Sequence, residues 1–293
     1  MKRKKLRSIF RKNIIAIQRH SHRAFLVDSE EDIHQLRLAF KKTRAFARLL
    51  SFADSVDRRK SLTGLKEIYR AAGKLRDLQI LQQSVSAHSE ILNIRDSLYL
   101  KSLASRIVGA KATVYSLIQG FSFDSVVATL LKKIPPKVRM KVVREYIENR
   151  LAAISVNLLK RLNDVQIHQV RRLLKDIDYC MASLPANKNG LTRLRKGRRK
   201  IKKLASLLGA YHDACVSETH LRSAASDTQE AGEATILRKL KKKNTFQKHL
   251  LKETVIQQLY IFKYETLPSL RSLKIGSGMP GLAGLIVLRI DTL

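Results

Sequence analysis

The sequence predicts an all-α protein in which one helical bundle occurs twice. Apolar residues recur at intervals of three and four along most of the chain, which is the spacing of amphipathic helices. Helix breakers are scarce, with 12 Gly and 5 Pro among 293 residues, and Trp is absent. Two motifs of the first half return in the same order in the second half. Because 44% of the residues are hydrophobic, the chain can bury a sizeable core.

The first half is predicted to consist of helices that end at a pair of prolines. Asp28, Ser29 and Asp32 are candidate caps for the second helix. Gly73 is expected to stop a helix, because glycine is the usual residue just past a helix end. Pro135-Pro136 marks the best internal boundary. The expected helices are about Arg3–His20, 28–52, Arg59–Ala72, one opening at Leu75, Ile94–Gln119 and Asp124–Lys132.

The second half is predicted to follow the same plan. Asn187 to Gly190 should form a turn, and Gly209 should stop a strongly basic helix. The residues after Pro268 show no periodicity. The expected helices are about Lys137–Leu162, Val165–Leu184, Leu191–Leu208, one opening at Tyr211, and Glu230–Tyr264. We therefore expect an N-terminal bundle over 1–134, a C-terminal bundle over 135–275 and an unassigned tail over 276–293.

The charge of the chain points to an anionic partner. Lys and Arg number 58 against 24 Asp and Glu, a formal charge of +34. Such an excess opposes compaction by self-repulsion, so a nucleic acid, an anionic membrane surface or a phosphate polymer is an expected partner. The basic N-terminus lacks the apolar core of a signal peptide, and the apolar run Leu282–Leu288 is too short to span a bilayer. Cys180 and Cys215 are expected to be idle thiols in a reducing compartment. We expect a soluble cytoplasmic protein with no membrane partner.

One helix carries a row of cations. His34, Arg37, Lys41, Arg44 and Arg48 follow one another at steps of 3, 4, 3 and 4, which stacks them on one stripe of a helix. At 1.5 Å rise per residue the stripe is roughly 20 Å long. A row of that length suits a long polyanion better than a small substrate, although most charge runs are merely solvated helix faces.

The stripe returns in the second half. His34-x-x-Arg37-x-x-x-Lys41 matches a His-x-x-Arg-x-x-x-Lys pattern that begins at His168, with Arg171 and Lys175. Downstream, Gly73-x-x-Arg76-Asp77 matches Gly209-x-x-His212-Asp213. The intervals from the His to the Asp are nearly equal, at 43 and 45 positions. Two motifs in one order and at one distance indicate an internal duplication.

These motifs resemble those of the CHAD domain, the conserved histidine α-helical domain. The likeness runs from about residue 5 to 270 and is better in the first half, where Lys42 and Arg44 also fit. In the second half Tyr179 and Leu208 fit, but Asp178 stands where the family usually has Arg. The resemblance implies two four-helix bundles related by a pseudo-twofold axis, with a basic cleft or pore between them. It also implies binding of inorganic polyphosphate, with no demonstrated catalytic role for the domain, and an association with polyphosphate granules.

The chemistry of the stripe suits a phosphate polymer. An Arg grips neighbouring oxygens with two parallel hydrogen bonds, whereas Lys acts as a point charge. His34 and His168 are either phosphate donors or structural hydrogen bonders, and as donors they would strengthen binding at mildly acidic pH. The predicted binding residues are His34, Arg37, Lys41, Lys42, Arg44, Arg48, Lys74, Arg76, His168, Arg171, Lys175, Arg195, Arg199, Lys202, Lys203 and His212.

Catalysis has little support in the sequence. The cations around the two histidines would repel a metal ion, and Asp77 and Asp213 are expected to cap helix N-termini or orient an arginine. Neither a Gly-x-x-x-x-Gly-Lys-(Ser/Thr) loop nor a Glu-x-Glu-x-Lys motif is present. We therefore expect no catalytic residue, metal or cofactor, with the oligomeric state left open. The alternatives are a nucleic-acid-binding protein, which the scarcity of aromatic residues (6%) disfavours, and a phosphohydrolase acting on phosphate polymers.

Overall fold

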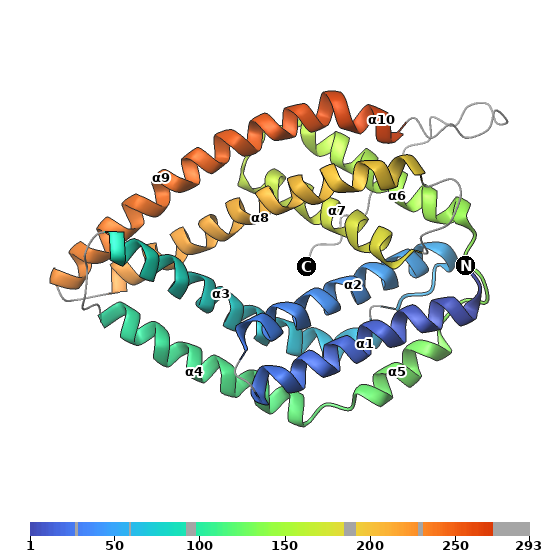
Figure 1. The fold of residues 1–293 in the computed structure, drawn as a ribbon, viewed down its shortest axis with the longest axis horizontal. Helices are drawn as coiled ribbons and strands as arrows, with labels where there is room; N and C mark the ends of the chain where they lie inside the picture. Colours follow the sequence, from blue (N-terminus) through green and yellow to red (C-terminus); the bar gives the residue numbers. More distant parts are fainter. Residues whose placement is uncertain (27–28, 59, 92–97, 185–191, 228–230, 272–293) are drawn as a thin grey trace.

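The computed structural model describes residues 1–26, 29–58, 60–91, 98–184, 192–227 and 231–271, and this part of the chain is helical almost throughout (Figure 1). The prediction of an all-α fold is confirmed, since the described residues contain no strand beyond an isolated bridge between Lys2 and Lys137. The α-helices are α1 (Arg3–Leu26), α2 (Glu30–Asp54), α3 (Thr63–Ile91), α4 (Leu98–Gln119), α5 (Phe123–Lys132), α6 (Met140–Leu159), α7 (Asp164–Ser183), α8 (Thr192–Asp227), α9 (Ala231–Ile261) and α10 (Leu267–Arg271). A short 3₁₀ turn precedes α3, and a π-helical turn links α9 to α10.

Side-chain caps fix where several helices begin. Ser29 caps α2 by accepting a hydrogen bond of 3.2 Å from the Asp32 amide, as expected from the sequence. Asn163 caps α7 in the same way, accepting from two amides at 3.0 and 3.1 Å. Ser55, with φ of 59°, ends α2 in the left-handed conformation. The two helices that carry the cationic stripes are thus fixed at their starts by short polar side chains.

The two glycines predicted to stop helices lie inside helices instead. α3 runs unbroken through Gly73, and α8 runs unbroken through Gly209. The prediction was wrong because the missing side chain serves close packing rather than a turn. A Cβ atom on Gly73 would lie 2.4 Å from Nη1 of Arg37, and one on Gly209 would lie 3.8 Å from Nε of Arg171. Gly73 therefore lets Arg37 of the first stripe helix lie against the α3 backbone, whereas at Gly209 a methyl group would meet Arg171 only at ordinary contact distance.

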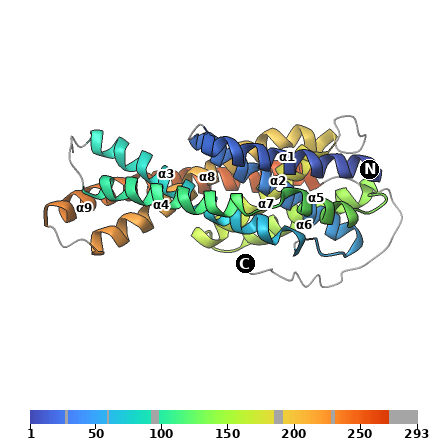
Figure 2. The same ribbon diagram turned by 90° about the horizontal axis from the view of Figure 1, so that it is seen from below.

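The halves of the chain meet through their motif helices. α2 packs against α7, so the two helices that carry the cationic stripes are in contact. α3 packs against α8, which brings together the helices that contain Gly73 and Gly209. At the α2–α7 contact the Cys180 thiol donates to the Ala45 carbonyl at 3.5 Å. At the far end Glu233 of α9 accepts from the amides of Leu98 and Tyr99, at 3.3 and 2.8 Å, and so caps α4. The molecule is long and shallow, with α3, α4, α8 and α9 together at one end (Figures 1 and 2).

The apolar core is continuous between the halves. α1 buries one apolar face, and Phe10 of α1 meets Phe46 of α2 edge to face at 5.1 Å. Phe40 is buried too. The Pro135-Pro136 link is held to the N-terminus, because the Arg3 amide donates to the Pro136 carbonyl at 2.9 Å. The duplication, the cleft and the boundaries 1–134 and 135–275 stay predictions. The Asn187–Gly190 turn and the 276–293 tail fall outside the described residues.

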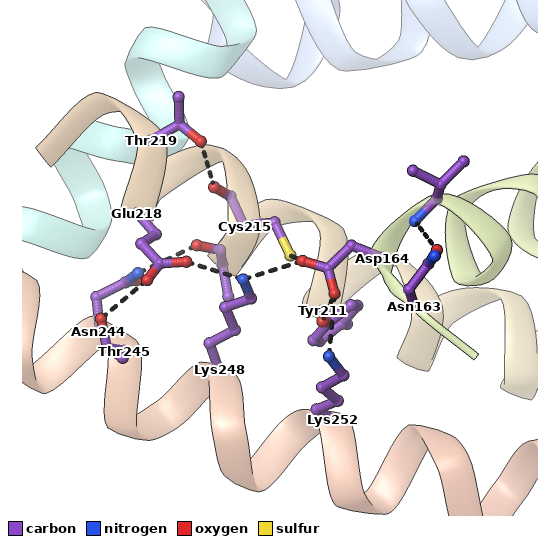
Figure 3. A network of polar contacts seen from close by, with 12 residues as sticks. Asn163, Asp164, Tyr211, Cys215, Glu218, Thr219, Asn244, Thr245, Lys248 and Lys252 are labelled. Atoms are coloured by element: carbon purple, nitrogen blue, oxygen red, sulfur yellow. Dashed lines mark hydrogen bonds and ion pairs between the residues drawn. The ribbon is translucent and has the colours of Figure 1, made fainter. Parts of the chain in front are cut away.

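A polar network fixes α7 against α8 and α9 (Figure 3). Tyr211 of α8 donates to the Asp164 carboxylate at 2.7 Å, and Lys248 and Lys252 of α9 pair with the same carboxylate at 3.1 and 3.2 Å. Although burial opposes ionisation, these hydrogen bonds lower the pKa of Asp164 to about 2. Lys248 also donates to Glu218 at 2.8 Å. The start of the second stripe helix is thereby anchored to α8 and α9.

Candidate functional site

The candidate site is a cluster of cations where α2, α3, α7 and α8 come together. Lys41 of α2 lies at its centre, and the charges that act on it come from Arg37 on its own helix and from Arg171 and Lys175 on α7. Burial and these three cations lower the pKa of Lys41 to about 7, against a modest opposing effect of Asp213. The packing of α2 on α7 therefore merges the two predicted stripes into one charged cluster.

Arg37 is held by α3. Its guanidinium lies against the backbone at Gly73 and over the ring of Tyr69, with 5.1 Å between the guanidinium carbon and the ring centroid. Arg44 lies over the same ring at 5.8 Å, and burial lowers its pKa. Tyr69 thus separates and orients two arginines of the first stripe. The sequence carries no local signal for this role of Tyr69, because the two arginines belong to another helix.

The second repeat contributes a histidine pair. His168 of α7 and His212 of α8 lie with ring centroids 4.7 Å apart. Burial lowers the pKa of His168, and burial with the charges of Arg171 and His168 lowers that of His212 to about 4. Both rings are therefore neutral at neutral pH in the unliganded protein. His34 lies at the exposed rim, where partial burial and the nearby Arg76, opposed by Glu31, lower its pKa.

Asp77 and Asp213 do not cap helices, as the sequence had suggested, because both lie inside continuous helices. They face the cations of the cluster and each other. Burial raises the pKa of both carboxyls, against the opposing charge of Arg37 on Asp77 and of Arg171 on Asp213. In the described cluster, three arginines and two lysines (Arg37, Arg76, Arg171, Lys41 and Lys175) thus face these two acids, which leaves a surplus of positive charge.

Several arginine donors in the cluster lack an acceptor. Within the described residues, Nη1 of Arg37 and the Nε atoms of Arg44, Arg76 and Arg171 are buried without a hydrogen-bond partner from the protein. Arg76 reaches Glu30 only at 3.5 Å. A buried charged donor without an acceptor is costly, so the unliganded site is under electrostatic strain that an anion would relieve.

Arg48, predicted as a binding residue, is neutralised by the protein instead. It pairs with the buried carboxylate of Asp176, which also accepts from Tyr146 at 2.6 Å and from Arg150 at 3.1 Å. Although burial opposes it, Asp176 raises the pKa of Arg48. This end of the stripe forms a buried link between α2, α6 and α7. The sequence signal was misleading because the neutralising acid lies 128 residues away.

The remaining predicted residues lie around the cluster. Asp178, the departure from the family pattern, pairs with Arg198 of α8 at 2.8 Å. Lys202 lies close enough to Lys175 to help lower its pKa, after burial and Arg171. Lys42 is half-buried on α2, whereas Lys74 of α3 and Arg199 and Lys203 of α8 are exposed. The Arg195 side chain falls outside what the structure describes.

Two further residues of the cluster were missed from sequence. His220 of α8 acts on Asp77, and burial with the charge of Arg106 lowers its own pKa. Arg172 of α7 acts on both Arg44 and His168. A signal for His220 existed, since it follows His212 by eight residues and so returns to a similar face of the helix. Among the described residues, no group of three or more His, Cys, Asp or Glu could hold a metal ion.

A family model for the CHAD domain matches residues 8–222, a range that includes the motif residues of both repeats. The chain belongs to the CHAD domain family. Two solved structures resemble the CHAD fold seen here. A CHAD domain from the plant Ricinus communis is 16% identical, with a TM-score of 0.66 over 88% of this chain and 91% of that one. PptA from Streptomyces chartreusis is 15% identical, with a TM-score of 0.64 over 88% of this chain and 99% of that one.

At these identities the two likenesses establish the fold. No curated protein matches the chain in a sequence comparison. As to membranes, no single helix of the described residues is long and apolar enough to cross one; α4 and α5, which are bent by 60° at their junction, reach that length and composition only as a pair.

Proposed function

We propose that this CHAD protein binds inorganic polyphosphate at the cluster of α2, α3, α7 and α8, and does not hydrolyse it. The observation that carries the proposal is the set of buried arginine donors without acceptors around a lysine whose pKa is lowered to about 7. Such a site is destabilised by its own repulsion until an anion arrives. Phosphate oxygens would accept from the guanidinium groups and restore the charge of Lys41, so binding relieves two costs at once.

A linear phosphate polymer fits better than a small anion. The cations come from four helices rather than from one loop, and they form a row along α2 that continues onto α7. Tyr69, an aromatic residue at the cluster, is contacted by Arg37 and Arg44 and stacks on buried Phe40 with 4.5 Å between the ring centroids, which leaves less of its ring for a base to stack on. This favours polyphosphate over a nucleic acid. Binding of this kind would also place the protein on polyphosphate granules in the cytoplasm.

The test compares two double variants that remove the same charges. Arg37→Ala with Lys41→Ala removes an Arg and a Lys one helical turn apart in the cluster. Arg238→Ala with Lys242→Ala removes an Arg and a Lys at the same spacing on the exposed face of α9. The measurement is made at pH 6, where Lys41 with its pKa of about 7 is about nine-tenths protonated, so that long-range electrostatics changes nearly equally in both. Each charged hydrogen bond lost from the cluster should cost about 1.5–3 kcal/mol, so the first double should bind at least tenfold more weakly than the second.

The dependence of log affinity on log salt should also flatten only in the Arg37/Lys41 double. Circular dichroism must show unchanged helix content. Equal losses from the two doubles would refute the site. Tighter binding of single- or double-stranded nucleic acid than of polyphosphate at matched salt would refute the ligand. Release of orthophosphate from the polymer by the purified protein with magnesium or manganese, abolished in the Arg37/Lys41 double, would refute the absence of catalysis.

A further inference from the structure

The outer face of α1 carries a second concentration of positive charge. Residues 1–27 contain nine Lys and Arg and no Asp or Glu. A surface hollow along α1 is lined by nine residues of this one helix, six of them the cations Arg3, Lys4, Arg7, Arg11, Lys12 and Arg19. All six are exposed. At 1.5 Å per residue they form a strip on the order of 24 Å long.

This strip is distinct from the cluster. Phe46, which packs on Phe10 of α1, is nine residues from Arg37 in α2, and nine steps of 100° place the two on opposite sides of that helix. α1 therefore packs on the side of α2 away from the cluster, and its exposed face is turned farther away still. One helix is roughly 10 Å across, so a ligand must pass around two helices, on the order of 20 Å, to reach from one site to the other.

The apolar face of α1 excludes a membrane-inserted role for this helix. Leu6, Phe10, Ile14 and Ile17 are at most 1% exposed in the protein core, so they are not available to a bilayer. Among the described side chains of α1, Ile15 is the one large apolar residue that is exposed, at 59%. The lining of the hollow contains no aromatic residue, so bases would find nothing to stack on. The strip therefore suits an anionic polymer that has neither aromatic bases nor acyl chains.

Within the described residues, the carboxylate that contacts α1 lies at the C-terminal end of this helix. There Asp32 of α2 bonds to His20 at 2.6 Å and lies 3.5 Å from Arg23. Nearer the N-terminus, Arg3 donates to the backbone carbonyl of Ile134 at 3.0 Å, a contact that leaves its charge uncompensated. Between these two ends, the side chains of Lys4, Arg7, Arg11 and Lys12 are exposed and can meet an external anion.

We propose that the outer face of α1 binds a second segment of polyphosphate, so that a long polymer contacts the protein at both the cluster and the strip. This inference rests on the proposed function. A polymer already held at the cluster presents its free portion to the strip at high effective concentration, which raises affinity without further contacts at the cluster. A short polymer cannot reach both surfaces. The strip therefore makes affinity depend on chain length.

The experiment uses a triple variant on α1 and a matched triple on α9. Lys4→Gln, Arg11→Gln and Lys12→Gln remove two lysines and one arginine from the strip. Arg238→Gln, Lys239→Gln and Lys242→Gln remove the same charges from exposed positions of α9. Glutamine is a good helix former, so both triples should keep their helix content. Affinities are measured for polyphosphates of about ten and about a hundred phosphates, the lengths that separate one-site from two-site contact.

The α1 triple should bind the long polymer about tenfold more weakly than the α9 triple, while the two bind the short polymer within about twofold of each other. Equal losses of the two triples on the long polymer would overturn the inference. So would a loss for the α1 triple that is as large on the short polymer as on the long one.

Two further arms identify other occupants. Vesicles rich in anionic phospholipid and a single-stranded oligonucleotide are tested with the same variants. If the α1 triple loses binding to either of them but keeps its affinity for the long polymer, the strip serves that partner and the inference is wrong. Failure of the proposed function looks different, because wild-type protein would then bind neither length of polymer at the cluster, and the Arg37/Lys41 double would change nothing.

Discussion

Lys41 should make polyphosphate binding dependent on pH in a defined window. Its pKa of about 7 lies well below the ordinary 10.5 because the amine is buried beside Arg37, Arg171 and Lys175. At pH 8 about nine-tenths of the unliganded protein therefore carries a neutral amine at this position. A bound phosphate chain favours the ammonium form, so binding at pH 8 should take up nearly one proton.

The size of the effect follows from linkage. While the pKa of the complex lies above 9, affinity should fall about fifty-fold between pH 7 and pH 9, close to 2.3 kcal/mol. The stability of the unliganded fold changes in the opposite direction. Because the unfolded chain keeps its proton up to about pH 10.5 and the folded chain loses it near 7, stability should rise with pH between these values. Below pH 7 both states carry the proton, and this contribution is constant.

Lys41→Arg provides the decisive comparison, because a guanidinium remains charged throughout this window. Isothermal titration calorimetry at pH 8, in buffers of different ionisation enthalpy, measures the protons taken up. Wild type should take up close to one, and Lys41→Arg close to none, with a nearly flat affinity from pH 7 to 9. His168 and His212 titrate lower, because burial lowers their pKa values, so they should show their uptake mainly in more acidic titrations. Equal proton uptake by wild type and Lys41→Arg at pH 8 would refute the role of Lys41.

Two other predictions test the packing around the cluster. Gly73→Ala should favour the helix by about 1 kcal/mol yet weaken polyphosphate binding, because the new methyl group displaces the Arg37 guanidinium. Gly209→Ala should bind polyphosphate as wild type does, because its Cβ would lie at ordinary contact distance from Arg171. Equal affinities of the two variants would contradict the close approach of Arg37 to Gly73. Arg48→Met should destabilise the fold by about 2–4 kcal/mol in urea unfolding, because it removes the main partner of buried Asp176. Arg37→Ala should not lower the urea midpoint, because it removes a buried Nη1 donor that has no acceptor among the described residues. Equal losses of stability would contradict this difference between the two arginines.

Local sequence determined the helices and their faces, because periodicity and capping act over a few residues. The amphipathic α1, the Ser29 cap of α2 and the burial of Phe40 and Phe46 could all be predicted from such patterns. The repeated motifs also identified most of the charged cluster, since Arg37, Lys41, Arg171 and Lys175 share the stripe spacing. Boundaries were less certain: the first helix was expected to end at His20 and continues to Leu26, and Met140 rather than Lys137 begins α6.

The glycines show why a local rule can fail. Gly73 and Gly209 have the residue type of a helix stop, yet both lie inside helices, and Gly73 serves a close approach of Arg37 from another helix. Asp77 and Asp213 have the residue type of a cap, yet they lie within helices and oppose the cations of the cluster. In each case the residue type marked a special position in the chain. The sequence did not identify the partner of that residue, because the partner belongs to another helix.

Sequence alone determined that this protein is helical, duplicated in its motifs and strongly cationic along particular helix faces. Only the tertiary structure decided which of those cations remain available to a ligand. Arg48 continues the stripe in sequence, but Asp176 of α7 pairs with it, while Nη1 of Arg37 and Nε of Arg171 are buried donors that no acceptor of the described residues satisfies. The physical reason is that helix formation depends on neighbours within a turn or two. The net charge and the pKa of a side chain depend instead on burial and on charges brought within a few ångströms from remote parts of the chain.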